Sequence, residues 1–386
     1  MHREHRYDVV VVGARAAGAA TAMLLACAGL DVLVVDRSRY GADTLSTHAL
    51  MRGGVIQLHR WGLLDRIVAA GTPPVRRTTF RYAAEEITIA IRPSHGIDAL
   101  YAPRRTVLDP ILVDAAVDAG VDVRYGITVS NVRRDRTGRV TGIVGRDHAG
   151  RGVAVDARLV IGADGIRSVV ADRVDAPIEH QGTGATAVVY GYWSGVPVDG
   201  YEWIFRTDAA AGLIPTNEGL TCVFAGASPR RIGRGGRAIL EEVLRDASPD
   251  AADRVAAGAG PAGLRTFIGR PGHLRRAWGP GWALVGDAGY WKDPISAHGL
   301  TDALRDADLL ARAVVAAAAD PSDEAEALAE YQAVRDRLSL PLFAVVDTIA
   351  GQRWSDDEIG GLLLQLSAAM ADEVDAIAAL DPVPVR

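Results

Sequence analysis

Residues 7–18 read Tyr-Asp-Val-Val-Val-Val-Gly-Ala-Arg-Ala-Ala-Gly, and residues 31–36 read Asp-Val-Leu-Val-Val-Asp. An apolar stretch over 19–30 joins them. The β-branched runs predict two strands, and the apolar stretch between them predicts a helix that begins at a glycine turn. A strand, a glycine turn, a helix and a second strand that ends in an acid are typical of a unit that binds a dinucleotide.

Each part of this unit has a physical role in binding. Gly13 permits the tight turn out of the strand, and Gly18 lets the helix lie close to the sheet. Asp36 ends the second strand, where a carboxylate can accept hydrogen bonds from a ribose. The cofactor-binding residues predicted around these three are Ala14, Arg15, Ala16 and Ala17 at the helix start, whose N–H groups face a pyrophosphate, and Arg37 after the acid.

Arg15 departs from the usual pattern, which has a glycine at this position so that the phosphate can approach the backbone. Two interpretations are open. The Arg15 side chain lies outside the turn in solvent, or it adds a positive charge near the phosphates.

Composition limits the class of protein. The 386 residues are 49% hydrophobic and 23% charged, as expected for a soluble globular protein of two domains, or of one large domain with an insertion. The formal net charge of −6 comes without a basic run, which argues against nucleic-acid binding. Cys27 and Cys222 form no CxxC pair, so we expect neither a redox dithiol nor a cysteine-based metal site, and we predict no metal ligands. A strand from about residue 7 and the lack of a long apolar run predict a cytoplasmic protein without an integral membrane segment.

Further along the chain, α/β patterns alternate with two β-rich stretches. Residues 43–71 predict an amphipathic helical segment, and alternating residues over 75–91 predict half-buried antiparallel strands. Three apolar strands run into turns, at Gly13, at Asp164-Gly165 and at Gly286-Asp287. Because the carboxyl ends of parallel strands meet at one edge of a sheet, we expect these turns to gather around a ligand. The two β-rich stretches would form one antiparallel sheet that covers this site.

Three ordered motifs resemble those of the class A flavoprotein monooxygenases and their relatives, the geranylgeranyl reductase-like enzymes and the flavin-dependent halogenases. The motifs are residues 13–18 with Asp36, residues 162–168 (Gly-Ala-Asp-Gly-Ile-Arg-Ser), and Gly286-Asp287-Ala288 followed by Pro294. The resemblance covers nearly the whole chain.

The resemblance implies an α/β fold. It has a Rossmann-like FAD-binding domain of the glutathione reductase type, an interleaved antiparallel β-sheet substrate domain, and C-terminal helices. The discontinuous FAD-binding domain would comprise 1–74, 100–174 and 265–325. The substrate-binding domain would comprise 75–99 and 175–264, and 326–386 would form the C-terminal helical segment.

The resemblance also implies roles for matched residues. Gly13, Gly18 and Asp36 would hold the ADP half of FAD, and Asp287, with Gly286, would bond the ribityl chain. Arg104 or Arg105 would approach the flavin or its pyrophosphate, unless the two are a solvated pair at a helix start. The remaining implied contacts are Asp164 and Gly165 near the pyrophosphate, and Pro294, Gly299, Leu300 and Thr301 at the helix that points to the flavin ring. The family more often has Gly where Ser296 stands and Asn at Thr301.

Two histidines and several aromatic residues are candidates for substrate chemistry. His48 and His298 are the predicted catalytic residues, because imidazole can act near neutral pH as a base toward a phenol or as a donor to substrate. For both, a structural hydrogen-bonding role is the alternative. The predicted substrate-binding residues are Tyr192, Trp203 and Phe205, which would wall an aromatic pocket or else build core, and Pro215, which resembles a family position facing the flavin.

Three functions are consistent with the sequence. The first is an FAD-dependent monooxygenase that consumes NADPH or NADH and hydroxylates or epoxidises an aromatic or polycyclic small molecule through a flavin hydroperoxide. Its partners would be molecular oxygen and a hydrophobic or aromatic substrate, and it would be a monomer or a homodimer. The second is a reductase of isolated double bonds in a prenyl-type substrate, and the third is a flavin-containing binding protein without turnover. The halogenase branch fits least, because the chain has no Trp-x-Trp-x-Ile-Pro pattern and its sole lysine, Lys292, lies in the third flavin motif.

Overall fold

A parallel sheet carries the three glycine turns. The computed structural model describes residues 6–261 and 263–381. Its first sheet has the order β16-β17-β8-β1-β2-β5, and β1 pairs in parallel with both β2 and β8. The strands are β1 (Arg6–Val12), β2 (Val32–Asp36), β5 (Asp122–Tyr125), β8 (Gly152–Gly162), β16 (Trp278–Gly279) and β17 (Trp282–Leu284). The hairpin of β6 (Thr128–Arg134) and β7 (Val140–Arg146) extends this sheet through β8.

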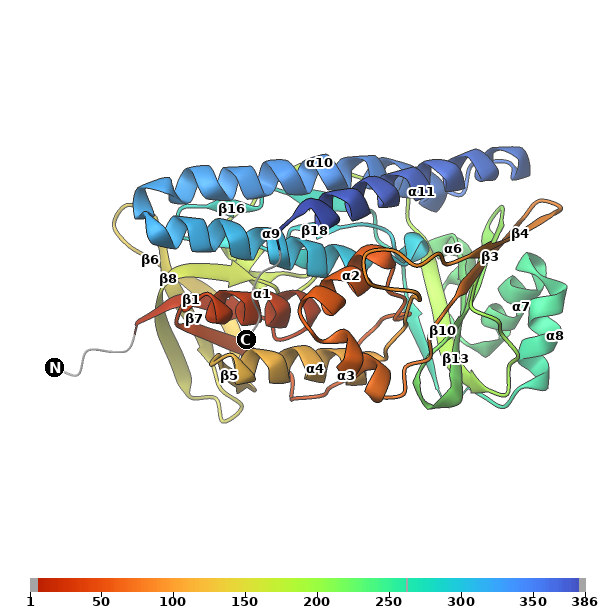
Figure 1. The fold of residues 1–386 in the computed structure, drawn as a ribbon, viewed down its shortest axis with the longest axis horizontal. Coiled ribbons are helices and arrows are strands. Elements are labelled where there is room, and N and C mark those ends of the chain that lie inside the picture. The colour runs from red at the N-terminus through yellow and green to blue at the C-terminus, as the bar shows by residue number, and fades with distance from the viewer. Residues whose placement is uncertain (1–5, 262, 382–386) are drawn as a thin grey trace.

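Helices cover the sheet and bury its apolar face. In Figure 1, α1 (Ala16–Cys27) lies between α4 (Arg105–Asp118) and α9 (Gly299–Ala319), and it contacts both. Val9, Val11, Val32 and Val34 belong to the same buried core as these helices. The expected helical segment over 43–71 is two short helices, α2 (Arg52–Arg60) and α3 (Leu64–Ala69), because the chain turns at Gly62 with φ of +69°. A short α5 (Val169–Arg173) follows β8.

The two β-rich stretches form one seven-stranded sheet, with the order β14-β10-β13-β12-β11-β3-β4. Its strands are β3 (Arg77–Tyr82), β4 (Glu85–Ala90), β10 (Ala187–Ser194), β11 (Tyr201–Arg206), β12 (Ala209–Pro215), β13 (Leu220–Ala227) and β14 (Leu264–Phe267). One pairing differs from the expectation of an antiparallel sheet, since β3 and β11 run parallel. These two strands come from different stretches of the chain, so no hairpin sets their direction.

The outermost strand of this sheet, β4, is exposed along its whole length. Ile87 is 40% exposed and Ile89 is 51% exposed, although their alternation predicted a half-buried strand. The reason is position: β4 pairs on one side only, with β3, and projects at the upper right of Figure 1.

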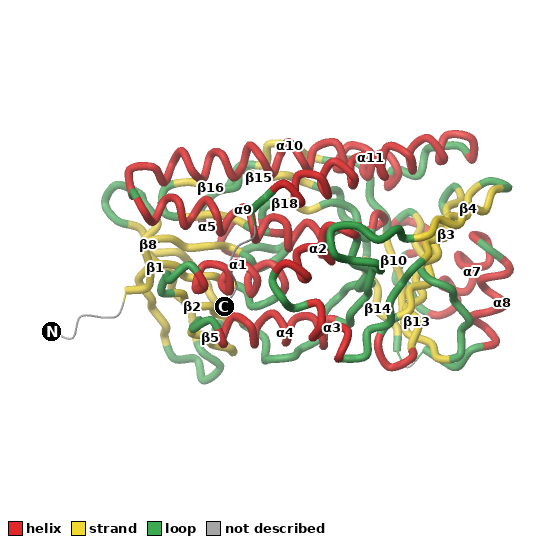
Figure 2. Tube along the Cα trace, viewed as in Figure 1, coloured by secondary structure: helices red, strands yellow, loops and turns green. Residues whose placement is uncertain are grey.

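Helices make up much of the rest of the molecule, as Figure 2 shows. On the far face of the seven-stranded sheet lie α6 (Pro229–Ile232), α7 (Arg237–Ala247) and α8 (Pro249–Ala257). After α9, α10 (Glu324–Ala350) runs back along it, and α11 (Asp356–Ala379) packs against α10 and α2. The remaining elements are η1 (Asn217–Gly219), η2 (Gly286–Ala288), η3 (Pro294–Ser296), η4 (Pro321–Asp323) and a small sheet of β9 (Ile178–Gln181), β15 (His273–Arg275) and β18 (Tyr290–Trp291). The architecture matches the expected Rossmann-like domain with a sheet domain and C-terminal helices.

Candidate functional site

The three strand-end turns meet at one edge of the parallel sheet. A Cβ atom built on Gly13 would lie 2.4 Å from the carbonyl oxygen of Ala163, in the turn after β8. A Cβ atom on Gly286, after β17, would lie 2.8 Å from Cβ of Ala17 on α1. No side chain fits at either glycine, so the backbone itself forms this edge. The gathering expected from the sequence is confirmed.

The start of α1 is a tight approach of helix to strand. A Cβ atom on Gly18 would lie 1.9 Å from the carbonyl oxygen of Gly13, so only glycine allows this packing. Gly13 has φ of +111°, a conformation that other residues rarely adopt. The first N–H groups of α1, from Ala16 onward, have no partner within the helix, which leaves them available to an anion.

The Arg15 side chain is hydrogen-bonded to neighbouring residues and is not free in solvent. It donates to the backbone oxygen of Ala42 at 3.2 Å and to Oδ2 of Asp109, on α4, at 3.3 Å. Its side chain is 31% exposed. Arg15 therefore places a partly paired positive charge at the helix start.

Asp36 and Asp164 use their carboxylates on the protein's own backbone. Oδ2 of Asp36 accepts from the N–H of Ala14 at 2.7 Å, and Oδ1 accepts from the N–H of Ser38 at 2.7 Å. Asp164 accepts from Oγ of Ser168 at 2.5 Å and from the N–H of Val169 at 2.6 Å. Asp36 thus braces the glycine turn and Asp164 caps α5, while Gly165, next to it, has open space where a side chain would be.

Arg104 and Arg105 point in different directions. Arg105 is 8% exposed and makes a two-bond ion pair with Asp109, at 2.9 and 3.0 Å. Arg104 instead lies over the ring of Tyr192, with its guanidinium carbon 4.3 Å from the ring centre. It is also 3.6 Å from Asp43, which binds Arg265 at 2.8 Å. The pair is therefore not solvated: Arg105 binds within its own helix, and Arg104 contacts Tyr192 of the seven-stranded sheet.

Asp287, the third acid at a strand end, differs from Asp36 and Asp164 in its hydrogen bonding. It lies in η2, is partly exposed, and accepts no hydrogen bond from the described residues. Desolvation raises its pKa to about 6, against the opposing charges of Lys292 and Arg105. A carboxylate that lacks protein donors is a suitable acceptor for ligand hydroxyl groups.

The start of α9 presents backbone donors. Gly299 is exposed with open space around it, and Leu300 is partly exposed. Thr301 is fully buried, and its hydroxyl accepts from the N–H of Met51 at 3.1 Å, which ties α9 to α2. Pro294, in η3, is partly exposed nearby in the chain. The positive end of this 21-residue helix therefore faces outward from the protein core.

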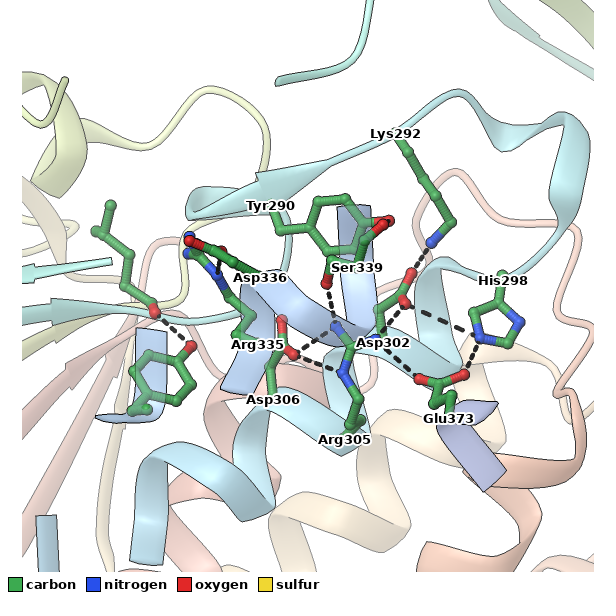
Figure 3. Close-up of polar contacts among 12 residues, drawn as sticks. Tyr290, Lys292, His298, Asp302, Arg305, Asp306, Arg335, Asp336, Ser339 and Glu373 are labelled. Atoms are coloured by element: carbon green, nitrogen blue, oxygen red, sulfur yellow. Dashed lines mark hydrogen bonds and ion pairs between the residues drawn. The ribbon is translucent and has the colours of Figure 1, made fainter. Parts of the chain in front are cut away.

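His298 sits just before α9, inside a buried charge cluster that Figure 3 shows. Its Nε2 atom bonds Oε2 of Glu373, which belongs to α11. Glu373 also accepts from Arg305 at 2.9 Å, and Asp302 contacts both Arg305 and Lys292. Because the ring of His298 is only 1% exposed, its contact with a ligand would be indirect.

The ligand atoms of His298, Asp302 and Glu373 lie within 4.8 Å of one another, which is close enough for a metal ion. The same carboxylates already contact Lys292 and Arg305. A divalent cation there would face two fixed positive charges, so we assign no metal to this cluster.

His48 is likewise buried, at 1% exposure, and its side chain contacts Tyr192. Its Nε2 atom bonds the Tyr192 hydroxyl, and the two rings stack at 17° with centres 5.6 Å apart. Burial lowers the pKa of His48 to about 3, and the charges of Arg105, Arg104 and Arg265 act in the same direction. The imidazole is therefore neutral at physiological pH.

The aromatic residues expected at the substrate lie on the face of the seven-stranded sheet that packs toward the parallel-sheet domain. Trp203 and Phe205 are 5% and 4% exposed and belong to the central core. Tyr192 and Pro215 are partly exposed. Tyr192 contacts the His48 ring and the Arg104 guanidinium, and among these three aromatic side chains it is the one exposed enough to contact a ligand.

Sequence reasoning missed the partners of His298. Glu373 is the one charged member of a buried stripe on α11 that otherwise holds apolar residues: Ile359, Leu363, Leu366, Ala369 and Ile377. Asp302, Arg305 and Asp306 similarly occupy buried positions of α9. A charged residue at a core-facing helical position could have indicated a buried ion pair, although the sequence does not show which residues pair.

The arrangement fits FAD. It combines a glycine turn with no room for a Cβ atom, the N–H groups of two helix starts, and a carboxylate at Asp287 that accepts no hydrogen bond from the part of the chain that the structure describes. Among the described residues, no helix has both the length and the hydropathy to cross a membrane.

Comparison with known proteins agrees with this assignment. Residues 6–341 match the family model described as FAD binding domain. A menaquinone reductase from Mycolicibacterium smegmatis is 28% identical over 319 residues, which cover 76% of this chain and 73% of the relative. A phenazine 1,6-dicarboxylic acid hydroxylase from Lysobacter antibioticus is 28% identical over 367 residues, which cover 85% and 86%. The structure of the flavin-dependent brominase Bmp2 superposes with a TM-score of 0.81 at 18% identity, over 97% of this chain and 94% of the brominase, and so shares the fold.

Proposed function

Because this chain belongs to the FAD-binding-domain family, within the class A flavoprotein monooxygenases and their relatives, we propose that it is an NAD(P)H-consuming monooxygenase of an aromatic or polycyclic small molecule. That it is an FAD-dependent oxidoreductase follows from the family and from the relatives. When bound, FAD can accept a hydride, and the reduced form can react with oxygen. The protein's own residues bind, orient and shield the reacting groups.

The cofactor would be held by the three turns at the sheet edge. The start of α1 would receive the pyrophosphate, and Asp287 would accept hydrogen bonds from the ribityl hydroxyls. The N–H groups at Leu300 and Thr301, with the positive end of α9, would stabilise negative charge at one edge of the flavin ring.

The observation that carries the substrate class is the setting of Tyr192. Its ring is partly exposed beside the Arg104 guanidinium, and its hydroxyl is held by a neutral imidazole rather than by a charged group. A flat aromatic substrate could stack beside this ring, and a substrate hydroxyl could exchange hydrogen bonds with the Tyr192 hydroxyl. Asp43, Arg104 and Arg265 would line the polar side of the same region.

A second candidate is a reductase of isolated double bonds. It is favoured by the similarity to the menaquinone reductase, which spans three quarters of both chains. Both functions need FAD and a hydride donor, and they differ in the fate of oxygen.

An isotope experiment separates the two functions. The holoenzyme would be reduced with NADPH or NADH without air, mixed with a panel of phenolic, polycyclic and polyprenyl compounds, and then given ¹⁸O₂. The proposal expects substrate-stimulated NAD(P)H oxidation and a product with one ¹⁸O atom. The Tyr192→Phe variant should retain bound flavin and show a higher KM.

The other outcomes are equally informative. A product that gains two hydrogens without oxygen would replace the monooxygenase with the reductase. Bound flavin without any substrate-stimulated turnover would identify a flavin-containing binding protein instead.

A further inference from the structure

Glu373, a residue outside the family match, lies beside the start of α9, the helix proposed to point to the flavin ring. The FAD-binding-domain match ends at residue 341, whereas α11 covers Asp356–Ala379. Glu373 of α11 is 1% exposed and bonds His298, immediately before α9. Figure 3 shows its carboxylate directed at His298 on one side, with Arg305 nearby.

This contact sets the tautomer of His298. Burial alone would raise the pKa of Glu373, but the charge of Arg305 and the hydrogen bond from His298 act against burial, and the pKa is lowered, so the group is a carboxylate. A carboxylate only accepts hydrogen bonds, and Nε2 of His298 must therefore carry its proton. Burial lowers the pKa of His298, which leaves Nδ1 with a lone pair, and this atom is buried with no hydrogen-bond partner among the described residues.

Residues from several elements surround Glu373 and contact the first turns of α9. From α9 itself, Arg305 binds Glu373 at 2.9 Å and Asp302 at 3.2 Å. From α10, Ser339 accepts from Arg305 at 2.8 Å, and Lys292, which follows β18, contacts Asp302. Gly53 of α2 also lies beside this cluster. A Cβ atom built on it would lie 3.2 Å from the Thr301 side chain and 3.8 Å from the Glu373 carboxylate, so the glycine allows α2 to pack close to both.

We propose that Glu373 is a positioning residue of the flavin site, which fixes the His298 ring and the first turn of α9 and places a negative charge behind that helix start. The charge opposes the positive end of α9. Reduced flavin carries negative charge, so the Glu373 carboxylate should lower the reduction potential of bound FAD. The proposal rests on the FAD site and does not depend on the identity of the substrate.

The first test is the midpoint potential of bound FAD, measured by reductive titration with a reference dye. The Glu373→Gln variant keeps the size of the side chain and removes its charge, so its potential should be more positive than that of the wild type. Asp372→Asn is the matched control, because Asp372 is the exposed neighbour on the same helix and loses the same charge. An unchanged or more negative potential in Glu373→Gln would overturn the proposal, as would an equal shift in both variants.

The second test reads His298 directly. In ¹⁵N-histidine-labelled holoenzyme, long-range ¹H–¹⁵N spectra should show His298 protonated at Nε2 and unprotonated at Nδ1. In Glu373→Gln the same signals should show both tautomers. An identical single tautomer in the two proteins would mean that Glu373 does not set the ring.

A third variant covers failure of Glu373→Gln to fold. Glu373→Asp keeps the charge and withdraws the carboxylate by one methylene group. It should retain a potential near the wild-type value while His298 shows mixed tautomers. A wild-type tautomer in this variant would contradict the positioning role.

Discussion

At the scale of single residues, the three acids that follow parallel strands differ in what their oxygens contact. Asp36 and Asp164 accept from backbone N–H groups of neighbouring turns, whereas Asp287 accepts from none of the described residues. The first two therefore stabilise the turns themselves. Asp287 keeps its acceptor capacity for a ligand.

Replacement of Asp287 should weaken FAD binding with little change in folding. Asp287→Ala leaves ribityl hydroxyls without their charged acceptor, and a hydrogen bond to a charged group contributes about 1.5–3 kcal/mol, so FAD affinity should fall roughly tenfold to a hundredfold. Flavin fluorescence during titration of the apoprotein measures the affinity. Asp375→Asn, at an exposed position of α11, is the control for lost charge. Full retention of flavin in Asp287→Ala would remove Asp287 from the cofactor site.

His48 should make stability depend on pH. Its pKa is about 3 in the folded protein and about 6.5 when unfolded, so it is neutral in both states above pH 6.5. As the pH falls below 6.5, only the unfolded chain takes up the proton, and the wild type loses about 1.4 kcal/mol per pH unit from this group. Relative to His48→Gln, the wild-type free energy of unfolding should therefore decline between pH 6 and pH 4.

Urea unfolding at several pH values tests this dependence, since all other groups cancel in the difference between the two proteins. The exposed His148, replaced by Gln, provides a comparison variant. A constant difference between wild type and His48→Gln over this range would show that His48 is protonated in the folded protein.

At the scale of elements, the contact of α1 with β1 depends on one missing methyl group. Gly18→Ala would bring Cβ to 1.9 Å from the Gly13 carbonyl oxygen, and the resulting shift of α1 should cost about 1–3 kcal/mol. Gly361→Ala, on α11, meets nothing within 4 Å and should stabilise the protein by about 0.5–1 kcal/mol. Thermal unfolding of the two variants should therefore shift in opposite directions. Equal shifts would mean that α1 relaxes without cost.

Elements with strong local signals could be predicted from the sequence. The βαβ unit over 7–36 follows from continuous β-branched apolar runs and from glycines that a turn requires, and the strands before Asp164 and Asp287 follow from similar apolar runs. Features set by distant parts of the chain could not be predicted. The parallel pairing of β3 with β11 and the exposure of β4 depend on which strand lies beside which, and local periodicity does not contain this information.

The same distinction applies to the site. The glycine turns and Asp287 stand out in sequence because their residue types are required locally. The partner of His298 lies 75 residues away on α11, and the partner of His48 lies 144 residues away on β10. Tertiary packing decides which residues pair in this way. A histidine in the sequence therefore indicates possible acid–base chemistry but does not identify its hydrogen-bond partner.

At the scale of the whole molecule, α9 joins parts that are far apart in sequence. Its start lies between the glycine turns of the parallel sheet and helix α2, and its length packs against α1 and α10. Helix α11 then reaches this start through Glu373. The proposed cofactor site therefore depends on elements from the whole fold rather than on one segment of the chain.

The contact between Glu373 and His298 has a consequence for the order of events during synthesis. A ribosome adds about 5–20 residues per second, so roughly 17–70 s pass between the appearance of Asp36 and that of Glu373. For that interval the nascent chain carries the turn proposed to bind the pyrophosphate without the carboxylate proposed to order the flavin end. FAD captured early would be held by one half of its site, and tight retention would begin only when the last helix docks.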